Sequence, residues 1–330
     1  MKKFLAALCI FLCTCSLFAT TIKIMSFNVN GFDDEKRNKN HQVLVDGNGQ
    51  VKIRNEIWFN NVCTIIKNSG ADIVLMQEFY IQQNEFADKA VEYFCSRLGG
   101  SWVYISTKDY INKGKNYSED QNNIIFYNNT KVNKSSNSIV NFSSPSEYRF
   151  AKNNTQVVEF SVSGEATKKF LIINVHLPRP AEKGKGGKHE SDLESLENIF
   201  RDFKNKDYRF VIGGDFNESY QKLKNRKFDG AFIDSDRMES LWTMVYNAPK
   251  KNEDIIKARI PKNGGPNDLD HFIVFGFTPN NMHHVFRHDW ESSKKDYSEG
   301  IQIGVNRYTK PDDYRENVSD HLPIMIELEL

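Results

Sequence analysis

Apolar and polar residues alternate from Thr21 to Asn28, and this period of two is typical of a strand with one buried face. Elsewhere, short and nearly continuous apolar runs lie between Gly, Pro, Asn and Ser residues, which is typical of buried strands. Such runs predict strands at residues 72–76, 102–106, 124–127, 157–162, 170–175, 210–215, 269–275, 285–288 and 323–330. Strand signals are therefore spread over the whole chain.

Three segments instead repeat their apolar residues at helical spacing. The first begins at Arg54 and is ended by Ser69 and Gly70, with a predicted buried face of Ile57, Trp58, Val62, Ile65 and Ile66. The second spans residues 84–98, and the third buries Leu193, Leu196, Ile199, Phe200 and Phe203. Residues 33–52 are predicted to form a surface loop, and residues 128–147 an exposed loop or sheet edge. No repeat or linker divides the chain, so one α/β domain with mixed strand pairing is expected over residues 20–330.

The composition excludes a strongly basic protein. The 44 basic and 43 acidic residues give a formal net charge of +1, so strong nonspecific binding to nucleic acid is not expected. A net charge near zero is still compatible with a local basic groove. A hydrophobic fraction of 39% and an aromatic fraction of 12% favour a well-packed globular protein over a disordered one.

The N-terminus resembles a signal peptide. Lys2 and Lys3 precede an apolar run at residues 4–12 that is too short to span a bilayer, and Ala19 offers a small residue for cleavage. Removal of residues 1–19 takes away two lysines and no acidic residue, which changes the formal net charge from +1 to −1. A secreted or periplasmic location is expected, with a lipid anchor at Cys13 or Cys15 as the alternative.

Only Cys63 and Cys95 remain in the predicted mature chain. Two distant cysteines cannot form a cysteine-based metal site without suitably spaced histidines. They form either one disulfide or two buried thiols, and the sequence leaves both alternatives open.

The segment at residues 210–217 carries the first candidate chemistry. Its apolar run ends in two glycines, followed by Asp215 and Asn217. In an extended backbone these two side chains point to the same face, at a strand end where open α/β sheets place ligands. A simple Gly-Asp turn is the structural alternative.

Polar groups that can bind metals or transfer protons stand at the ends of other predicted strands as well. These are Asn28, Glu78, His176, Asp270, and Asp320 with His321. Carboxylate and amide oxygens suit a hard cation such as Mg²⁺, or alternatively Mn²⁺. A hard cation combined with acid–base histidines is suited to cleavage of phosphate esters. Each residue alone has a structural explanation, as a helix cap, a turn residue or a core histidine, so the prediction depends on the joint pattern.

The chain resembles the endonuclease/exonuclease/phosphatase superfamily, which has the deoxyribonuclease-I-like fold. The matching segments are residues 26–30, 75–78, 174–177, 213–217, 269–272 and 319–323. They occur in the family's order, and the Gly-Asp-x-Asn and Ser-Asp-His-x-Pro segments are specific. The resemblance implies a four-layered sandwich in which helices flank two mixed β-sheets, with the active site at one edge.

The resemblance also implies a role for each carboxylate and amide. Glu78 is expected to be the principal metal ligand, helped by Asn28 and Asp320. Asp215 and Asn217 are expected to hold the phosphate and the attacking water, or a second ion. The expected cofactor is Mg²⁺, with Mn²⁺ as the alternative.

The two histidines are implied to move protons. His321, oriented by Asp270, is the expected general base, because a carboxylate fixes the imidazole tautomer and raises the basicity of the other nitrogen. His176 is implied to bind the phosphate and assist the leaving group. The family's nuclease pattern places a supporting Glu where this chain has Gln121, with Glu119 nearby, so the acid role of His176 is the least supported.

Differences from individual subfamilies reduce the number of substrate classes that are expected. Apurinic endonucleases carry Tyr at the position of His176, and inositol polyphosphate 5-phosphatases carry an aromatic residue and Arg at the positions of Glu218 and Ser219. A secreted nuclease acting on DNA or RNA is the leading expectation. A sphingomyelinase-like phosphodiesterase that recognises a phospholipid head group, and a toxin-like nuclease or phosphoinositide phosphatase, are alternatives. A non-catalytic surface protein is the remaining class. The lysine-rich loop at residues 182–188 offers contacts to an anionic substrate or is simply solvated.

Overall fold

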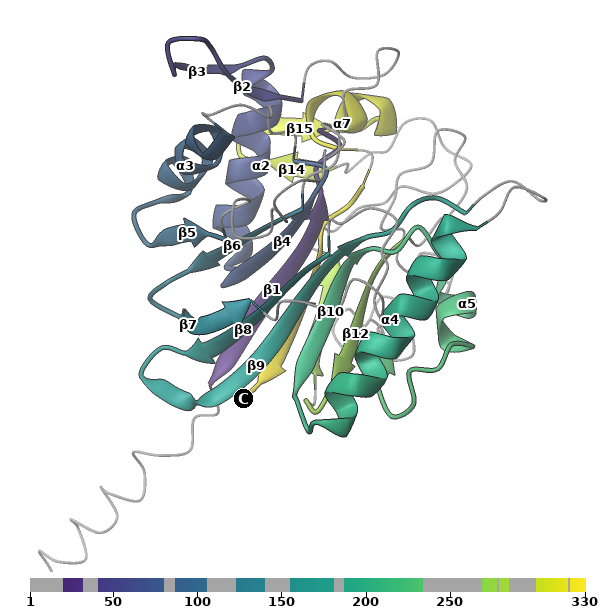
Figure 1. Ribbon diagram of the computed structural model, residues 1–330. Helices are drawn as coiled ribbons and strands as arrows, with labels where there is room; N and C mark the ends of the chain where they lie inside the picture. Colours follow the sequence, from purple (N-terminus) through teal and green to yellow (C-terminus); the bar gives the residue numbers. More distant parts are fainter. Residues whose placement is uncertain are drawn as a thin grey trace, which may run out of the picture.

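Two six-stranded β-sheets pack face to face at the centre of the molecule (Figure 1). This computed structural model describes residues 20–31, 41–79, 87–105, 123–139, 155–180, 187–233, 269–277, 279–284, 301–319 and 321–330. The predicted signal peptide at residues 1–19, the predicted strand at residues 285–288, Gln121 with Glu119, and Asp320 lie outside these residues. Within the described part of the chain, no helix is long and apolar enough to cross a membrane.

Both sheets are mixed. The first has the strand order β13 (Pro279–His284), β16 (Ile324–Glu329), β1 (Thr21–Asn28), β4 (Ile73–Gln77), β6 (Ile124–Asn128) and β5 (Trp102–Tyr104). The second has the order β11 (Phe232–Ile233), β12 (Asp270–Phe275), β10 (Phe210–Asp215), β9 (Glu165–His176), β8 (Gln156–Val162) and β7 (Val132–Ile139). Strand β1 is parallel to β4 and antiparallel to β16, and β10 is parallel to β9 and antiparallel to β12.

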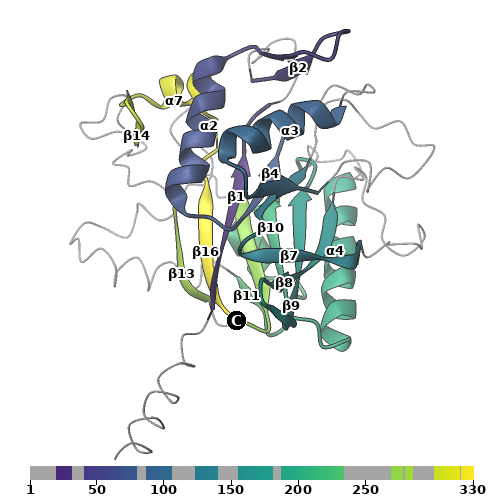
Figure 2. The same cartoon turned by 90° about the vertical axis from the view of Figure 1, so that its left-hand side faces the viewer.

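Helices cover the outer face of each sheet, which completes four layers (Figure 2). Helices α2 (Glu56–Ser69) and α3 (Ala87–Leu98) pack on the first sheet, and α4 (Lys188–Asn205) packs on the second. The core accordingly divides into three apolar clusters, one under each helical layer and one between the sheets. The expected fold class, a sandwich of two mixed sheets flanked by helices, is confirmed.

The elements predicted within the described residues lie close to those observed. Several others were not predicted, namely β11, β13, β14 (Ile301–Ile303), β15 (Asn306–Tyr308) and α7 (Pro311–Asn317). Two further regions differ from the prediction. Strands β2 (Val43–Val45) and β3 (Val51–Ile53) form a hairpin where a loop was predicted, around a turn in which the Asp46 side chain accepts from the backbone of Asn48 and Gln50. Ile57 was predicted to be buried but is 52% exposed, because it lies on the solvent-facing stripe of α2 together with Asn60 and Lys67. Strand β7 occupies the edge of its sheet, one of the two alternatives for that region.

The described cysteines are two buried free thiols. Cys63 lies on α2 and Cys95 on α3, and burial raises the pKa of each thiol to about 12. Of the two alternatives left open by the sequence, the structure has the pair of thiols.

Strand register brings the polar strand ends to one edge of the sandwich. In the first sheet Asn28 pairs with Gln77, and in the second Asp215 pairs with both His176 and Asp270. Because β1 and β4 are parallel, and β9 and β10 are parallel, each pair ends at the same edge of its sheet. The two sheets thereby present their polar termini to each other.

A buried polar bridge joins the sheets just below this edge. Gln77 Nε2 donates to Asn174 Oδ1 at 2.8 Å, and Asn174 Nδ2 lies 3.2 Å from the backbone oxygens of both Met76 and Ile124. Gln77 and Asn174 are fully buried. Because buried polar atoms without partners are costly, these bonds favour one position of one sheet over the other.

We expect Asn174→Ala to lower the free energy of unfolding by about 2–4 kcal/mol, because each buried polar group left unsatisfied costs about 1–3 kcal/mol. Urea denaturation followed by tryptophan fluorescence measures the change. Ile172→Val, on the same face of β9, is the matched control and removes only one buried methyl group, at about 0.5–1.5 kcal/mol. Equal losses in the two variants would show that the bridge contributes no more than ordinary packing.

Candidate active site

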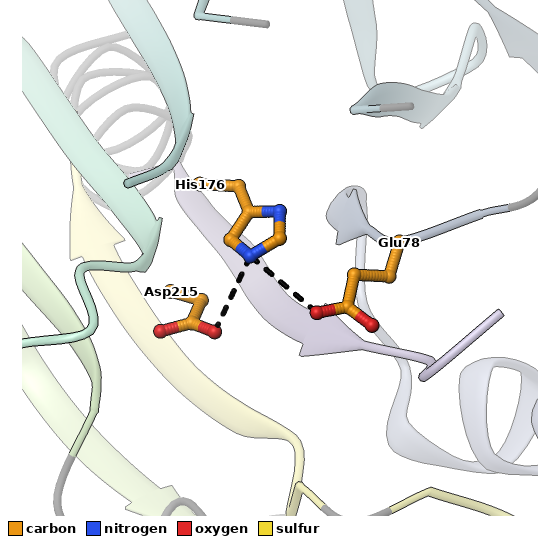
Figure 3. A group of neighbouring side chains, drawn as sticks. All are labelled: Glu78, His176 and Asp215. Atoms are coloured by element: carbon orange, nitrogen blue, oxygen red, sulfur yellow. Dashed lines mark ion pairs between the residues drawn. The ribbon is translucent and has the colours of Figure 1, made fainter. Parts of the chain in front are cut away.

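Asp215 is the centre of the polar cluster at the sheet edge. Its Oδ2 accepts a hydrogen bond from Asn28 Nδ2 at 3.1 Å. The same oxygen lies 3.7 Å from His176 Nε2 and 3.7 Å from His321 Nε2. Figure 3 shows the His176 ring with its Nε2 directed between the carboxylates of Asp215 and Glu78. Groups from both sheets therefore meet at one carboxylate oxygen.

Two glycines allow β10 to carry Asp215 into this position. Gly214 has φ +147, and a Cβ added there would lie 1.9 Å from the Val175 backbone oxygen. A Cβ at Gly213 would lie 2.7 Å from side-chain atoms of both Leu75 and Phe272. The strand can therefore approach its neighbours only because both positions lack a side chain.

Asn217 joins Asp215 through a turn. Its φ of +48 is left-handed, so the chain has left the extended conformation from which a shared face was predicted. The Asn217 backbone N–H donates to Asp215 Oδ1 at 2.8 Å, and its Nδ2 donates to the Leu177 backbone oxygen at 2.8 Å. The backbone of Asn217 thus contacts the Asp215 carboxylate, whereas the Asn217 side chain binds the Leu177 backbone.

Glu78 enters the site because the backbone turns after β4. Alternation along β4 would direct residue 78 toward the helical layer, since Met76 packs there. Glu78 instead has φ +53, and its Oε1 accepts from Asn28 Nδ2 at 3.1 Å and lies 3.4 Å from His176 Nε2. Asn28 thus donates to both Glu78 and Asp215, while its own Oδ1 accepts from the Asn30 backbone at 3.0 Å.

His321 and Asp270 form a buried pair on the other side of Asp215. The distance from His321 Nδ1 to Asp270 Oδ2 is 2.6 Å. A carboxylate accepts only, so Nδ1 carries the proton, and Nε2 of the neutral ring is left as the proton acceptor. This is the arrangement that the sequence predicted for a general base.

Ser319 connects this pair to the opposite strand. Its Oγ donates to the Asn28 backbone oxygen at 2.6 Å and accepts from the His321 backbone N–H at 3.0 Å. Sequence analysis gave Ser319 no role, although it begins one of the matching segments. Its place in that segment was the available signal, and the bonding partner lies 291 positions away in the chain.

The cluster is electrostatically suited to a cation. Burial raises the pKa of Asp215 to about 7, against the influence of His321, which lowers it. One ligand atom each from Glu78, His176 and Asp215 lie within 4.8 Å of one another. Two carboxylates with an imidazole fit a divalent ion, which would offset the cost of burying their charges.

Most of the predicted site residues lie in one cluster. The structure brings together Asn28, Glu78, His176, Asp215, Asn217, Asp270 and His321. Asp320, predicted as a metal ligand, lies outside the described residues. His176 was predicted to contact phosphate, and it also belongs to the group whose ligand atoms could hold an ion.

A fold and site of this kind define a metal-dependent phosphoesterase. The sequence profile of the Endonuclease/Exonuclease/phosphatase family matches residues 25–321, and the chain belongs to this family. Members of the family are phosphoric-ester hydrolases that depend on a divalent metal, and the chain is an enzyme of this class.

Solved structures share the fold at low sequence identity. TDP2 from C. elegans has a TM-score of 0.56 at 17% identity, covering 99% of this chain and 81% of that one. TDP2 from D. rerio, complexed with a single-strand DNA product, has a TM-score of 0.52 at 14% identity, covering 94% and 100%. A mannosyl-6-phosphatase from Bacteroides thetaiotaomicron has a TM-score of 0.53 at 15% identity, covering 94% and 100%. No curated protein matches the sequence.

We expect Gly214→Ala to destabilise the protein by about 2 kcal/mol or more and to abolish most activity, because the new Cβ overlaps the Val175 oxygen and the backbone conformation becomes strained. Thermal denaturation and hydrolysis of bis(4-nitrophenyl) phosphate measure the two effects. Gly100→Ala is the control, since no atom lies within 4 Å of a Cβ built there. Similar behaviour of the two variants would mean that close approach of β10 and β9 is not required.

Proposed function

We propose that this chain is a secreted, Mg²⁺-dependent nuclease that hydrolyses phosphodiester bonds of DNA or RNA. The observation that carries the proposal is the convergence at Asp215 of a carboxylate-oriented histidine, His321, with the carboxylate of Glu78. Those groups can deprotonate water beside a site for a hard cation, which is the requirement for hydrolysis of a phosphate diester.

Metal binding and proton transfer are assigned to different residues. Glu78, with Asp320 and Asn28, would hold the Mg²⁺, and Mn²⁺ is the alternative ion. When bound, the ion would neutralise charge that develops on the phosphate. His321 accepts a proton from water at Nε2, and Asp270 stabilises the resulting imidazolium.

The remaining polar residues hold the reactants. Asp215 and Asn217, linked through their own hydrogen bond, orient the attacking water and the phosphate. His176 Nε2 lies on the Glu78 side of Asp215, whereas His321 lies on the Asp270 side. The two histidines contact different carboxylates beside Asp215, so His321, oriented by Asp270, is assigned to the attacking water and His176 to the leaving group.

One observation favours a nucleic acid over other phosphate esters, and a second favours a secreted enzyme. The TDP2 structure with a single-strand DNA product is a precedent for this fold beside a DNA strand. The signal-like segment at residues 1–19 suits a secreted nuclease better than a repair enzyme. A phosphomonoesterase is the second candidate, because a mannosyl-6-phosphatase shares the fold over 94% of this chain. A phospholipid head group is a further alternative substrate.

We expect His321→Ala to reduce kcat for Mg²⁺-dependent hydrolysis of bis(4-nitrophenyl) phosphate by about 10²–10⁴-fold, the usual contribution of a positioned base. Asp270→Ala should reduce kcat as well, but the double variant should be no slower than His321→Ala, because Asp270 acts through the histidine. Chelation by EDTA should abolish turnover, and excess Mg²⁺ should restore it.

Two results would contradict this mechanism. Full activity of a folded His321→Ala variant would remove the histidine as base. Additive losses in the double variant would show that Asp270 acts independently of His321. Thermal denaturation of each variant distinguishes lost chemistry from lost folding.

We expect DNA or RNA to be cleaved faster than sphingomyelin, phosphoinositides or mannose 6-phosphate in a side-by-side assay. Culture medium and cell extract of an expressing strain are assayed separately, and activity is expected in the medium. Faster turnover of mannose 6-phosphate would favour the phosphomonoesterase, and faster turnover of sphingomyelin would favour the lipid enzyme. Activity confined to the cells would contradict secretion.

A further inference from the structure

Two buried histidines outside the reacting cluster hold the loop that follows β10. His189, in the first turn of α4, lies with Nε2 3.1 Å from the Phe216 backbone oxygen. His271, in β12, lies with Nε2 2.9 Å from the Glu218 backbone oxygen. The two acceptors flank Asn217. Both histidines are at most 4% exposed, so these bonds form away from competing water.

The chemistry of these contacts fixes the state of each ring. A backbone carbonyl only accepts, so Nε2 must carry the hydrogen in both His189 and His271. Burial is the largest influence on the pKa of His189 and lowers it, which favours the neutral ring. Each histidine is therefore a directed N–H donor to the backbone of the loop.

Strand alternation explains why His271 does not face the reacting groups. Asp270 faces the space between the sheets, where it binds His321, and Phe272 packs in the same layer. His271 lies on the opposite face of β12 and packs its ring against Phe216, with centroids 5.8 Å apart. Asp270 and His271, which are adjacent in β12, thus contact the site from opposite faces of the strand.

The loop needs such anchors because of what it carries. Asn217 has a left-handed backbone, an uncommon conformation for a residue other than glycine. Its N–H donates to Asp215 Oδ1, so displacement of the loop would also displace the central carboxylate. The neighbouring bonds, from Phe216 N–H to the Leu269 oxygen and from Ser219 N–H to Glu218 Oε1, restrain only the N–H side of the loop. On the carbonyl side, Leu177 N–H donates to the Asp215 oxygen at 2.9 Å. His189 and His271 restrain the carbonyls of Phe216 and Glu218.

We propose that His189 and His271 are positioning residues, which clamp the loop at residues 215–218 through its carbonyls and so hold Asp215 and Asn217 in their reactive arrangement. The part of this inference that concerns catalysis rests on the proposed phosphodiesterase function. The clamp itself is a property of the loop and can be measured without a substrate.

Matched amide substitutions test the clamp. Gln places its side-chain nitrogen near the position of histidine Nε2, whereas Asn places it near Nδ1, so only Gln can reach the loop carbonyls. We expect His189→Asn and His271→Asn to lower kcat by about 10²-fold with little change in KM, because a displacement of about 1 Å costs this much. His189→Gln and His271→Gln should recover most of that loss.

Hydrogen exchange provides a readout that does not depend on activity. In the Asn variants, the amides of Phe216, Asn217 and Ser219 should exchange about tenfold faster than in the wild type, and the Gln variants should restore their protection. Phe200→Leu, further along α4, is the control, and it should lower the melting temperature without changing loop exchange or kcat. An inactive wild type with the expected exchange pattern would overturn the proposed function and leave the clamp supported. Equal exchange and kcat in Asn, Gln and wild-type proteins would overturn the clamp.

Discussion

Hydrogen bonds from Asn174 to Gln77 and to the Met76 and Ile124 backbones cross the space between the two sheets just below the active site, and the position of the site depends on them. Most of the layer between the sheets is an apolar cluster, and apolar contact is not directional, so it stabilises many relative positions of two sheets nearly equally. A buried amide pair is satisfied in only one such position. Glu78 directly follows Gln77, and His176 lies two residues beyond Asn174, so the bridge also determines where these two meet.

The reacting cluster conflicts electrostatically with its own surroundings. Asp215 is buried close to the carboxylates of Asp270 and Glu78, and burial raises the pKa of Asp215. Asn28 donates to Glu78 and Asp215, and His321 Nδ1 donates to Asp270, which relieves part of this conflict. A divalent cation would relieve more, so the residues that make the site costly for folding are those that make it selective for a metal.

Much of this arrangement is predictable from the sequence, and the part that is not has physical causes. The strand at Thr21–Asn28 is predicted with its observed bounds, because alternation stops where turn residues begin. The hairpin of β2 and β3 is not, because strands of three residues are too short to show a period. Asp215, Asp270 and His321 are predicted as a site because polar residues at the ends of buried strands have no packing reason to be there.

The supporting residues were harder to predict, because their role depends on contacts made in three dimensions. Gln77, Asn174, Ser319 and His271 all lie inside segments recognised for their neighbours, yet nothing in a linear pattern tells a catalytic side chain from one that holds it. His189 gave only the signal of a polar residue on the buried face of a helix.

Three of these supporting residues act in the same way, which links the fold to the chemistry. Ser319 binds the backbone of Asn28, His189 that of Phe216, and His271 that of Glu218, so all three hold main chain and leave the reacting side chains to one another. A backbone carbonyl is present whatever the residue type, so such a contact survives substitution of the residue that it holds. The positions of the reacting side chains can therefore be set by these backbone contacts, while their protonation and metal binding are set by the contacts of the side chains themselves.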